Sequence, residues 1–249
     1  MAVTPPGRGG VTIETAMVMA AGLGKRMRPL TATRPKPLIR IGGKALIDYA
    51  LDRIEAAGIG KVVVNAHYLP DALEAHLRRS KRAFSVAMSD ERAQLMETGG
   101  GLIQAQRAGL FSGDPVLCAN SDNIWTDGPY DTIGRMADAW DGEAMDALLL
   151  LVPHTRAVGH GGRGDFRMDG AGKLTRRKSG AIAPYIFSGV QLLSRRLLRD
   201  PPEGPFSTNI LWDRAIEEGR LYGIAHEGSW CDVGTVAAIP KVEAVLAGG

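Results

Sequence analysis

Apolar runs and amphipathic segments alternate from residue 15 to about residue 152, and this alternation constrains the fold more than any other feature of the sequence. The apolar runs have the length of buried strands, and the segments between them repeat apolar residues at the spacing of a helix. The predicted strands are residues 15–20, 61–65, 84–88 and 115–119, and the predicted helices are residues 45–57, 71–79, 101–108 and 133–140. Short connections between such elements are typical of an α/β fold, in which helices flank a mostly parallel sheet.

The second half of the chain is less regular. Its predicted strands are residues 165–168, 182–187 and 221–225, and its predicted helices are residues 209–218 and 236–246. We interpret residues 14–249 as a single domain in which residues 155–190 form a small β-rich insertion. Residues 1–13 begin with a Pro/Gly-rich stretch, and we expect a flexible arm there, outside the fold.

The composition is that of an ordinary globular protein. Hydrophobic residues make up 45% of the chain and charged residues 23%, which excludes disorder as the main state. The longest apolar run, residues 147–153, is too short to span a bilayer, and residues 1–10 lack the apolar core of a signal peptide. Cys118 and Cys231 lie in apolar segments, which favours buried free thiols. We therefore expect a cytoplasmic protein without a membrane partner.

The positive charge is concentrated in two segments. The whole chain carries +3, but residues 1–40 carry +6 and residues 163–178 carry +4, which leaves −7 on the remainder. Two cationic segments on an acidic body favour anionic ligands at particular places. They do not fit a generally basic surface, so we expect no nucleic-acid partner.

A glycine-rich, basic loop follows the first predicted strand, where residues 20–31 read AAGLGKRMRPLT. Small residues let a ligand approach the backbone closely, and the N–H groups of such a turn can bind phosphate. The dinucleotide fingerprint would need a third glycine where Met27 stands. The P-loop would need Ser or Thr where Arg26 stands, so the sequence has neither motif.

Lys36 and Asp122 are candidate site residues because of their surroundings. Lys36 lies between Pro35 and Pro37, and two prolines stiffen the backbone around its ammonium group. Asp122 follows the predicted strand at residues 115–119, at the carboxyl end, where open α/β sheets bind ligands.

The loop and the lysine together resemble the sugar-1-phosphate nucleotidylyltransferases. The first-strand motif of that family, L-A-A-G-x-G-x-R-[ML]-x-P-L-T followed by P-K-P, is matched by residues 19–31 and 35–37, with methionine in place of the first leucine. Further similarity lies in residues 97–101 (ETGGG), 162–166 (GRGDF) and 230–235 (WCDVGT). The resemblance implies a Rossmann-like, GT-A-like nucleotidyltransferase domain with a mixed, mostly parallel sheet and a β-rich insertion at the sugar site.

The resemblance also implies an activity. Members of the family are Mg²⁺-dependent enzymes that transfer a nucleotidyl group from an NTP to a sugar 1-phosphate and release pyrophosphate. The later segments favour UTP as donor and N-acetylmuramate α-1-phosphate as acceptor, a reaction of peptidoglycan recycling. Mannose 1-phosphate with GTP, glucose 1-phosphate with UTP or dTTP, and a non-catalytic sugar-nucleotide sensor stay open as alternatives. The assembly is expected to be a monomer or a small homo-oligomer.

Metal and catalytic roles follow from the same resemblance. Asp122 and Asp232 match the metal ligands of the family, and Arg26, Lys36 and Asp122 match its catalytic residues. Arg26 is expected to hold the β- and γ-phosphates, and Lys36 to contact phosphate where charge builds up. Whether Lys178, Arg163 or Arg28 also holds the sugar phosphate stays open.

The substrate contacts implied by the resemblance fall into two sets. Expected nucleotide contacts are Ala20, Ala21, Gly22, Gly24, Lys25, Arg26, Thr98, Gly99, Gly100 and Asn120. Expected contacts of the sugar phosphate are Lys36, Asp165, Ser188, Gly189 and Asp232.

The histidines show no metal-ligand spacing with a carboxylate or a cysteine. His154 and His160 flank a glycine-rich segment, and we interpret both as loop residues. Trp230, close to Asp232, is expected either to pack in the core or to line the sugar site.

Overall fold

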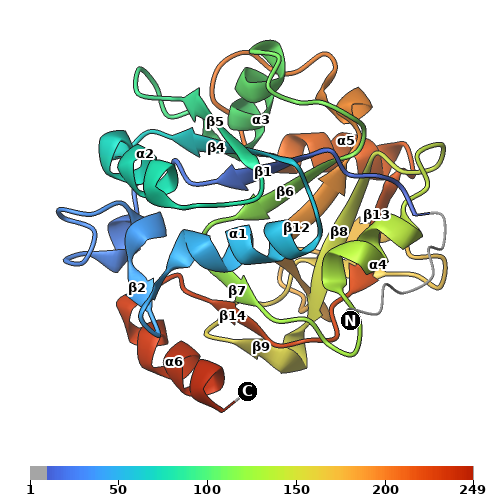
Figure 1. The fold of residues 1–249 in the computed structure, drawn as a ribbon. Helices are drawn as coiled ribbons and strands as arrows, with labels where there is room; N and C mark the ends of the chain where they lie inside the picture. The colour runs from blue at the N-terminus through green and yellow to red at the C-terminus, as the bar shows by residue number, and fades with distance from the viewer. Residues whose placement is uncertain (1–9, 249) are drawn as a thin grey trace, which may run out of the picture.

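The computed structural model describes residues 10–248 and is built around a nine-stranded sheet (Figure 1). Parallel strands run in the order β5-β4-β1-β6, β12 pairs antiparallel with both β6 and β8, and β13 pairs parallel with β8. The predicted mixed, mostly parallel sheet is therefore confirmed. Its strands are β1 (Thr15–Met19), β4 (Lys61–Ala66), β5 (Ser85–Asp90), β6 (Val116–Asn120), β8 (Ala147–Pro153), β10 (Phe166–Met168), β11 (Leu174–Arg176), β12 (Tyr185–Leu193) and β13 (Leu221–Ala225).

Helices cover both faces of this sheet because successive strand residues point to opposite sides. In β1, Ala16 and Val18 pack with the helices of one face, and Met17 packs with those of the other. The first face is covered by α1 (Leu46–Ala56), α2 (Pro70–Arg79) and α4 (Thr132–Ala139), and the second by α3 (Glu97–Arg107) and α5 (Asn209–Glu217) (Figure 1). Burial on both sides explains why the predicted strands were continuous apolar runs.

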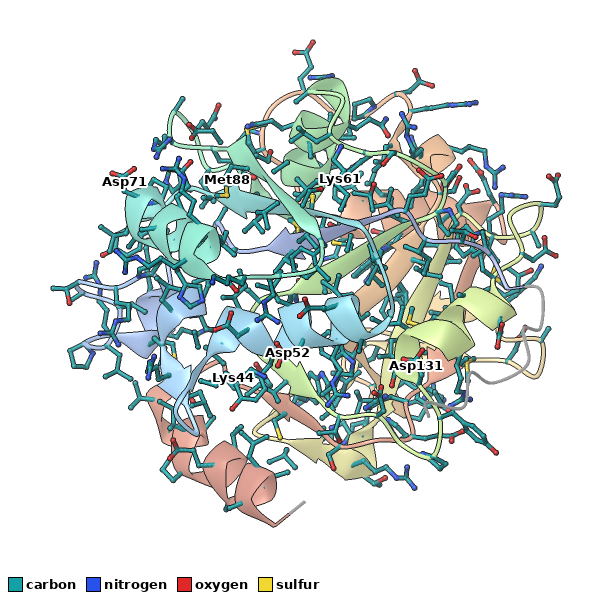
Figure 2. The ribbon with its side chains drawn as sticks, in the orientation of Figure 1. Lys44, Asp52, Lys61, Asp71, Met88 and Asp131 are labelled. Carbon is teal, nitrogen blue, oxygen red and sulfur yellow. The ribbon has the colours of Figure 1, made fainter. Side chains whose placement is uncertain are left out.

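The beginning of α4 shows how a local sequence signal sets a helix boundary. Asp131, labelled in Figure 2, precedes the helix, and its side chain accepts hydrogen bonds from Ile133 N at 3.3 Å and Gly134 N at 2.8 Å. These bonds satisfy backbone donors that have no partner within the helix. The helix therefore begins at Thr132, one residue before the predicted start.

A second, three-stranded sheet lies beside the main one and has the order β7-β14-β9. It joins β7 (Asn123–Trp125), β14 (Trp230–Asp232) and β9 (Ala157–Val158), which are far apart in the sequence. A small apolar cluster that includes Met27, Ile124 and Val233 connects this sheet to α6 (Ile239–Ala247). The remaining short elements are η1 (Lys25–Met27), η2 (Lys36–Leu38), β2 (Arg40–Ile41), β3 (Lys44–Ala45), η3 (His154–Arg156), η4 (Arg195–Leu198) and η5 (Val236–Ala238).

Residues 155–190 contain β9, β10, β11 and the beginning of β12. The last three join the main sheet and β9 joins the three-stranded one. The predicted arm, residues 1–13, falls mostly outside the described residues. Its described end packs against the domain, since Val11 N donates to Ala137 O at 3.2 Å and the apolar side chain of Ile13 contacts the core.

Both cysteines are free and buried, as expected. Burial in apolar surroundings raises the pKa of the Cys118 thiol to about 12, so this sulfur stays protonated and unreactive. Among the helices within residues 10–248, none combines the length and the hydrophobicity that crossing a bilayer requires.

His226, in the loop after β13, makes the stability of the fold depend on pH. Its side chain is buried, its Nε2 lies 3.2 Å from Ser229 O, and burial lowers its pKa below the ordinary value. The unfolded chain therefore takes up a proton near pH 6.5 that the folded protein does not, and the free energy of unfolding falls as the pH drops below this value. We expect His226→Gln to reduce that dependence, by at most about 1.4 kcal/mol per pH unit.

Urea unfolding of both proteins at pH 7.5 and pH 5.0 measures this effect. An equal loss of unfolding free energy in wild type and variant between the two pH values would contradict the assignment.

Candidate functional site

Two adjoining hollows open at the carboxyl ends of β1 and β6. The first encloses about 390 Å³ and the second about 370 Å³. The residues common to both linings are Met19, Thr98, Asn120, Asp122 and Ser207. The hollows are therefore two halves of one cleft, with Asp122 at their junction.

Lys36 reaches this junction from η2. Its Nζ donates to Asp122 Oδ2 at 2.6 Å, and its side chain is only 11% exposed. Pro35 caps the short helix in an extended conformation and Pro37 continues it, so the backbone holds the lysine as the sequence indicated. The buried ammonium group thus lines the first hollow and contacts the aspartate that lines both halves of the cleft.

The second aspartate arrives through the pairing of β14 with β7. Asp232 lies opposite Asn123 in that pair, and Val233 N donates to Asp122 O at 3.2 Å. Two carboxylates that are far apart in the sequence thus come together beside the junction of the two hollows. Burial and the neighbouring Asp122 raise the pKa of the Asp232 carboxyl above its ordinary value, against the opposing effect of nearby cations.

The carboxylates of Asp122 and Asp232 are ligands of the kind that Mg²⁺ prefers. The ligands are hard oxygens, and the raised pKa of Asp232 indicates negative charge that the protein alone does not fully compensate. Within the described residues, no group of three or more His, Cys, Asp or Glu side chains is arranged to hold a metal. An ion held by Asp122 and Asp232 would therefore take its other ligands from water and from substrate phosphates, as Mg²⁺ commonly does.

A buried polar network supports the floor of the first hollow. Asn65 Oδ1 accepts from Ala20 N at 2.6 Å, and Asn65 Nδ2 donates to Glu91 Oε1 at 2.7 Å. The other carboxylate oxygen of Glu91 accepts from Met96 N at 3.0 Å. This chain of bonds fixes the turn after β1, and it also occupies the N–H group of Ala20, which cannot then donate to a ligand.

Several predicted nucleotide contacts line the first hollow: Ala20, Ala21, Gly22, Thr98 and Asn120. Gly99 and Gly100 do not. They belong to α3, which begins at Glu97 and not at residue 101, and their N–H groups donate to Phe206 O at 2.8 and 3.1 Å. A Cβ at Gly99 would lie 2.4 Å from the Phe206 ring, so close packing places glycine in this helix despite its low propensity.

Gly24 and Lys25 lie outside both linings. Gly24 precedes η1 with φ +61°, and its carbonyl accepts from Thr31 Oγ1 at 2.8 Å, which closes the loop. Lys25 is exposed. The loop is thus shaped by internal bonds, and only part of it faces the cleft.

The predicted sugar contacts Ser188 and Gly189 also lie behind the wall of the cleft. Ser188 is fully buried, and its carbonyl accepts from Trp230 Nε1 at 2.8 Å. Gly189 has φ +88° at a break in the β12 register, and a Cβ there would lie 2.2 Å from Asn123 Oδ1. Both residues therefore position cleft residues instead of facing a ligand.

The second hollow contains the other predicted residues. Arg26, Asp165 and Asp232 line it together with Asp122. The positive charge of Arg26 lowers the pKa of Asp232, which places the two at the same end. Arg163, Arg28 and Lys178, the candidates left open for the sugar phosphate, do not line either hollow.

Three residues of the second hollow were missed or left undecided in the sequence. His160 lies in a loop, as interpreted, but its Nδ1 is 3.8 Å from Asp232 Oδ2 and it lines the hollow, which the sequence did not indicate. It is brought there by Gly159, whose φ of +79° and close approach to Asp232 O exclude a side chain. Trp230 both packs in the core and lines the hollow. Arg176 lines it as well, two residues before Lys178, one of the candidates left open for the sugar phosphate.

The fold and the cleft define a class of protein. A mixed, mostly parallel sheet with a glycine-rich turn, a buried lysine and paired aspartates at its carboxyl edge is typical of enzymes that bind phosphorylated ligands. The sequence model described as nucleotidyl transferase matches residues 15–162, which is more than half of the chain. The protein belongs to this family, and the resemblance of the first-strand motif is confirmed.

Two relatives are similar over nearly their whole length. The N-acetylmuramate alpha-1-phosphate uridylyltransferase of Caulobacter vibrioides is 44% identical over 94% of this chain and 97% of its own. The enzyme of the same name from Neisseria meningitidis serogroup B is 34% identical over 92% and 97%. Among solved structures, a UDP-glucose pyrophosphorylase complexed with UDP-glucose matches with a TM-score of 0.76 at 15% identity, over 95% of this chain and 99% of its own. This last match supports the fold alone.

Proposed function

We propose that the protein transfers the uridylyl group of UTP to N-acetylmuramate α-1-phosphate and releases pyrophosphate, a reaction of peptidoglycan recycling in the cytoplasm. The observation that carries the proposal is the meeting of Lys36, Asp122 and Asp232 at the junction of the two hollows. The long similarity to two uridylyltransferases supports the choice of substrates.

The reaction joins two anions. An oxygen of the sugar 1-phosphate attacks the α-phosphorus of UTP, and the bond from that phosphorus to the oxygen bridging to the β-phosphate breaks. We assign the nucleoside to the first hollow and the sugar to the second, so that the reacting phosphorus lies near the shared wall. Catalysis then consists mainly of positioning and of compensating negative charge.

We assign a separate role in the reaction to each charged residue of the cleft. Lys36 donates hydrogen bonds to phosphate oxygens where charge builds up, and Arg26 stabilises the leaving pyrophosphate. Asp122 and Asp232 would hold Mg²⁺, which would supply positive charge to the phosphate oxygens. Asp165, whose Oδ2 already accepts from Phe187 N at 2.9 Å, is oriented to accept from a sugar hydroxyl.

A pyrophosphate-release assay tests the proposal by crossing ATP, CTP, GTP and UTP with a panel of sugar 1-phosphates, with and without EDTA. We expect release with UTP and N-acetylmuramate α-1-phosphate, and none after EDTA treatment. Release only with GTP and mannose 1-phosphate, or only with glucose 1-phosphate, would reassign the substrates. An absence of release with every pair would favour a sugar-nucleotide sensor.

A further inference from the structure

Arg176 presents a guanidinium group to the second hollow from β11. Its Nε donates to Asp213 Oδ1 at 2.7 Å and its Nη2 donates to Asn209 O at 3.1 Å. Across residues 10–248, no acceptor within hydrogen-bond distance is found for its Nη1. The side chain is thus anchored by two bonds and keeps donor capacity at the wall of the cleft.

Two aromatic rings pack close to this guanidinium. Its Cζ lies 5.0 Å from the centre of the Phe166 ring and 5.5 Å from that of Trp212. The two rings meet edge to face, with their centres 5.9 Å apart. A guanidinium that is stacked and hydrogen-bonded in this way loses little further freedom when it binds a carboxylate.

The other cations that line the cleft, among the residues described, are close to the aspartate pair. Lys36 bonds to Asp122, and the charges of Lys36, His160 and Arg26 all lower the pKa of Asp232. Arg176 bonds instead to Asp213 and to the backbone of Asn209. Its neighbour in the wall is Asn209, at the beginning of α5, where the helix dipole adds positive potential.

The second hollow, of about 370 Å³, is therefore lined both by the cations near Asp232 and by Arg176, which has other partners. Unlike mannose and glucose, N-acetylmuramate bears a carboxylate, which belongs to the lactyl ether on its C3. We propose that Arg176 binds this carboxylate and so selects an acidic sugar 1-phosphate as the acceptor. The inference rests on the proposed function, because it names the residue that would recognise the proposed acceptor.

The test compares two acceptors on four proteins. The acceptors are N-acetylmuramate α-1-phosphate and its lactyl carboxamide, which is neutral in its side chain and of nearly equal size. The proteins are the wild type, Arg176→Met, Arg176→Lys and a control variant, each checked for folding by circular dichroism. The readout is kcat/KM for each acceptor at saturating UTP.

We expect the wild type to prefer the carboxylate acceptor by about 10- to 100-fold, the usual effect of a hydrogen bond to a charged group. Arg176→Met should lose this preference through a higher KM for the carboxylate acceptor, with the carboxamide almost unaffected. Arg176→Lys, which keeps the charge but not the planar fork, should retain part of the preference. Arg167→Met, on the neighbouring β10 and outside both linings, is the matched control and should behave as the wild type.

Two results would overturn the inference while leaving the proposed function intact. One is an equal loss on both acceptors in Arg176→Met and Arg176→Lys, which would indicate a structural role. The other is an unchanged preference in both variants. If the wild type turned over neither acceptor, the proposed function itself would fail, and the inference with it.

Discussion

Replacing Lys36 with alanine is expected to lower kcat by about 10²- to 10³-fold without unfolding the protein. The ammonium group lies at the shared wall of the two hollows, 2.6 Å from Asp122, and is held there between two prolines. A donor fixed at the place where charge develops stabilises the transition state more than the bound substrates. The loss should therefore appear mainly in kcat and less in KM.

Steady-state kinetics with UTP and the acceptor, together with a thermal melt, measure the effect. Lys36→Met removes the charge but keeps most of the apolar stem, so it separates loss of charge from loss of packing. Lys81→Ala is the control, because Lys81 is an exposed lysine after α2 and lies outside both linings. An unchanged kcat/KM in Lys36→Ala would refute the role of this lysine.

The second large effect is expected from the aspartate pair. Asp122→Asn and Asp232→Asn should each lower kcat by at least about 10²-fold and weaken the activation by Mg²⁺. The amide keeps the size of the side chain but removes the negative charge that a hard cation needs. Asp138→Asn, an exposed aspartate on α4, is the matched control.

Although Asp232→Asn should lower kcat, it should make the metal-free protein more stable. Because burial and Asp122 raise the pKa of Asp232, its ionisation at neutral pH costs folding free energy in the absence of metal, and this cost disappears as the pH falls. Without Mg²⁺, Asp232→Asn should therefore melt above the wild type at pH 7.5. Mg²⁺ with UTP should stabilise the wild type and not the variant. A lower melting temperature for Asp232→Asn at pH 7.5 without metal would contradict this role of the buried charge.

The main sheet and its helices were predictable because their signals are local. Long apolar runs and helical periodicity identified β1, β4 and β6 and the helices α1 and α2 to within one or two residues. The cleft residues of the loop after β1 were also predictable, because a long motif fixes the position of each one. The error at α3 arose because consecutive glycines indicate a loop unless a neighbour such as Phe206 excludes side chains from the helix.

The sequence could not show by which contacts the distant segments of the chain bring their residues into the cleft. Asp232 meets Asp122 through strands of three residues, β14 and β7, which are too short for a periodic signal. His160 reaches the same place only because Gly159 passes close to the backbone of β14. Nothing in the sequence distinguished Arg176 from the other basic residues of its segment. Its proposed role depends on packing against Trp212 of α5, which is distant in the sequence.

If this cleft transfers a nucleotidyl group to the oxygen of a sugar phosphate, that oxygen can be followed from substrate to product. N-acetylmuramate α-1-phosphate labelled with ¹⁸O in its terminal phosphate oxygens is incubated with UTP, Mg²⁺ and the protein, and the products are analysed by mass spectrometry. We predict that all of the label appears in the UDP-sugar and none in the released pyrophosphate. Label in the released anion, or the absence of a UDP-sugar, would contradict nucleotidyl transfer to the sugar phosphate.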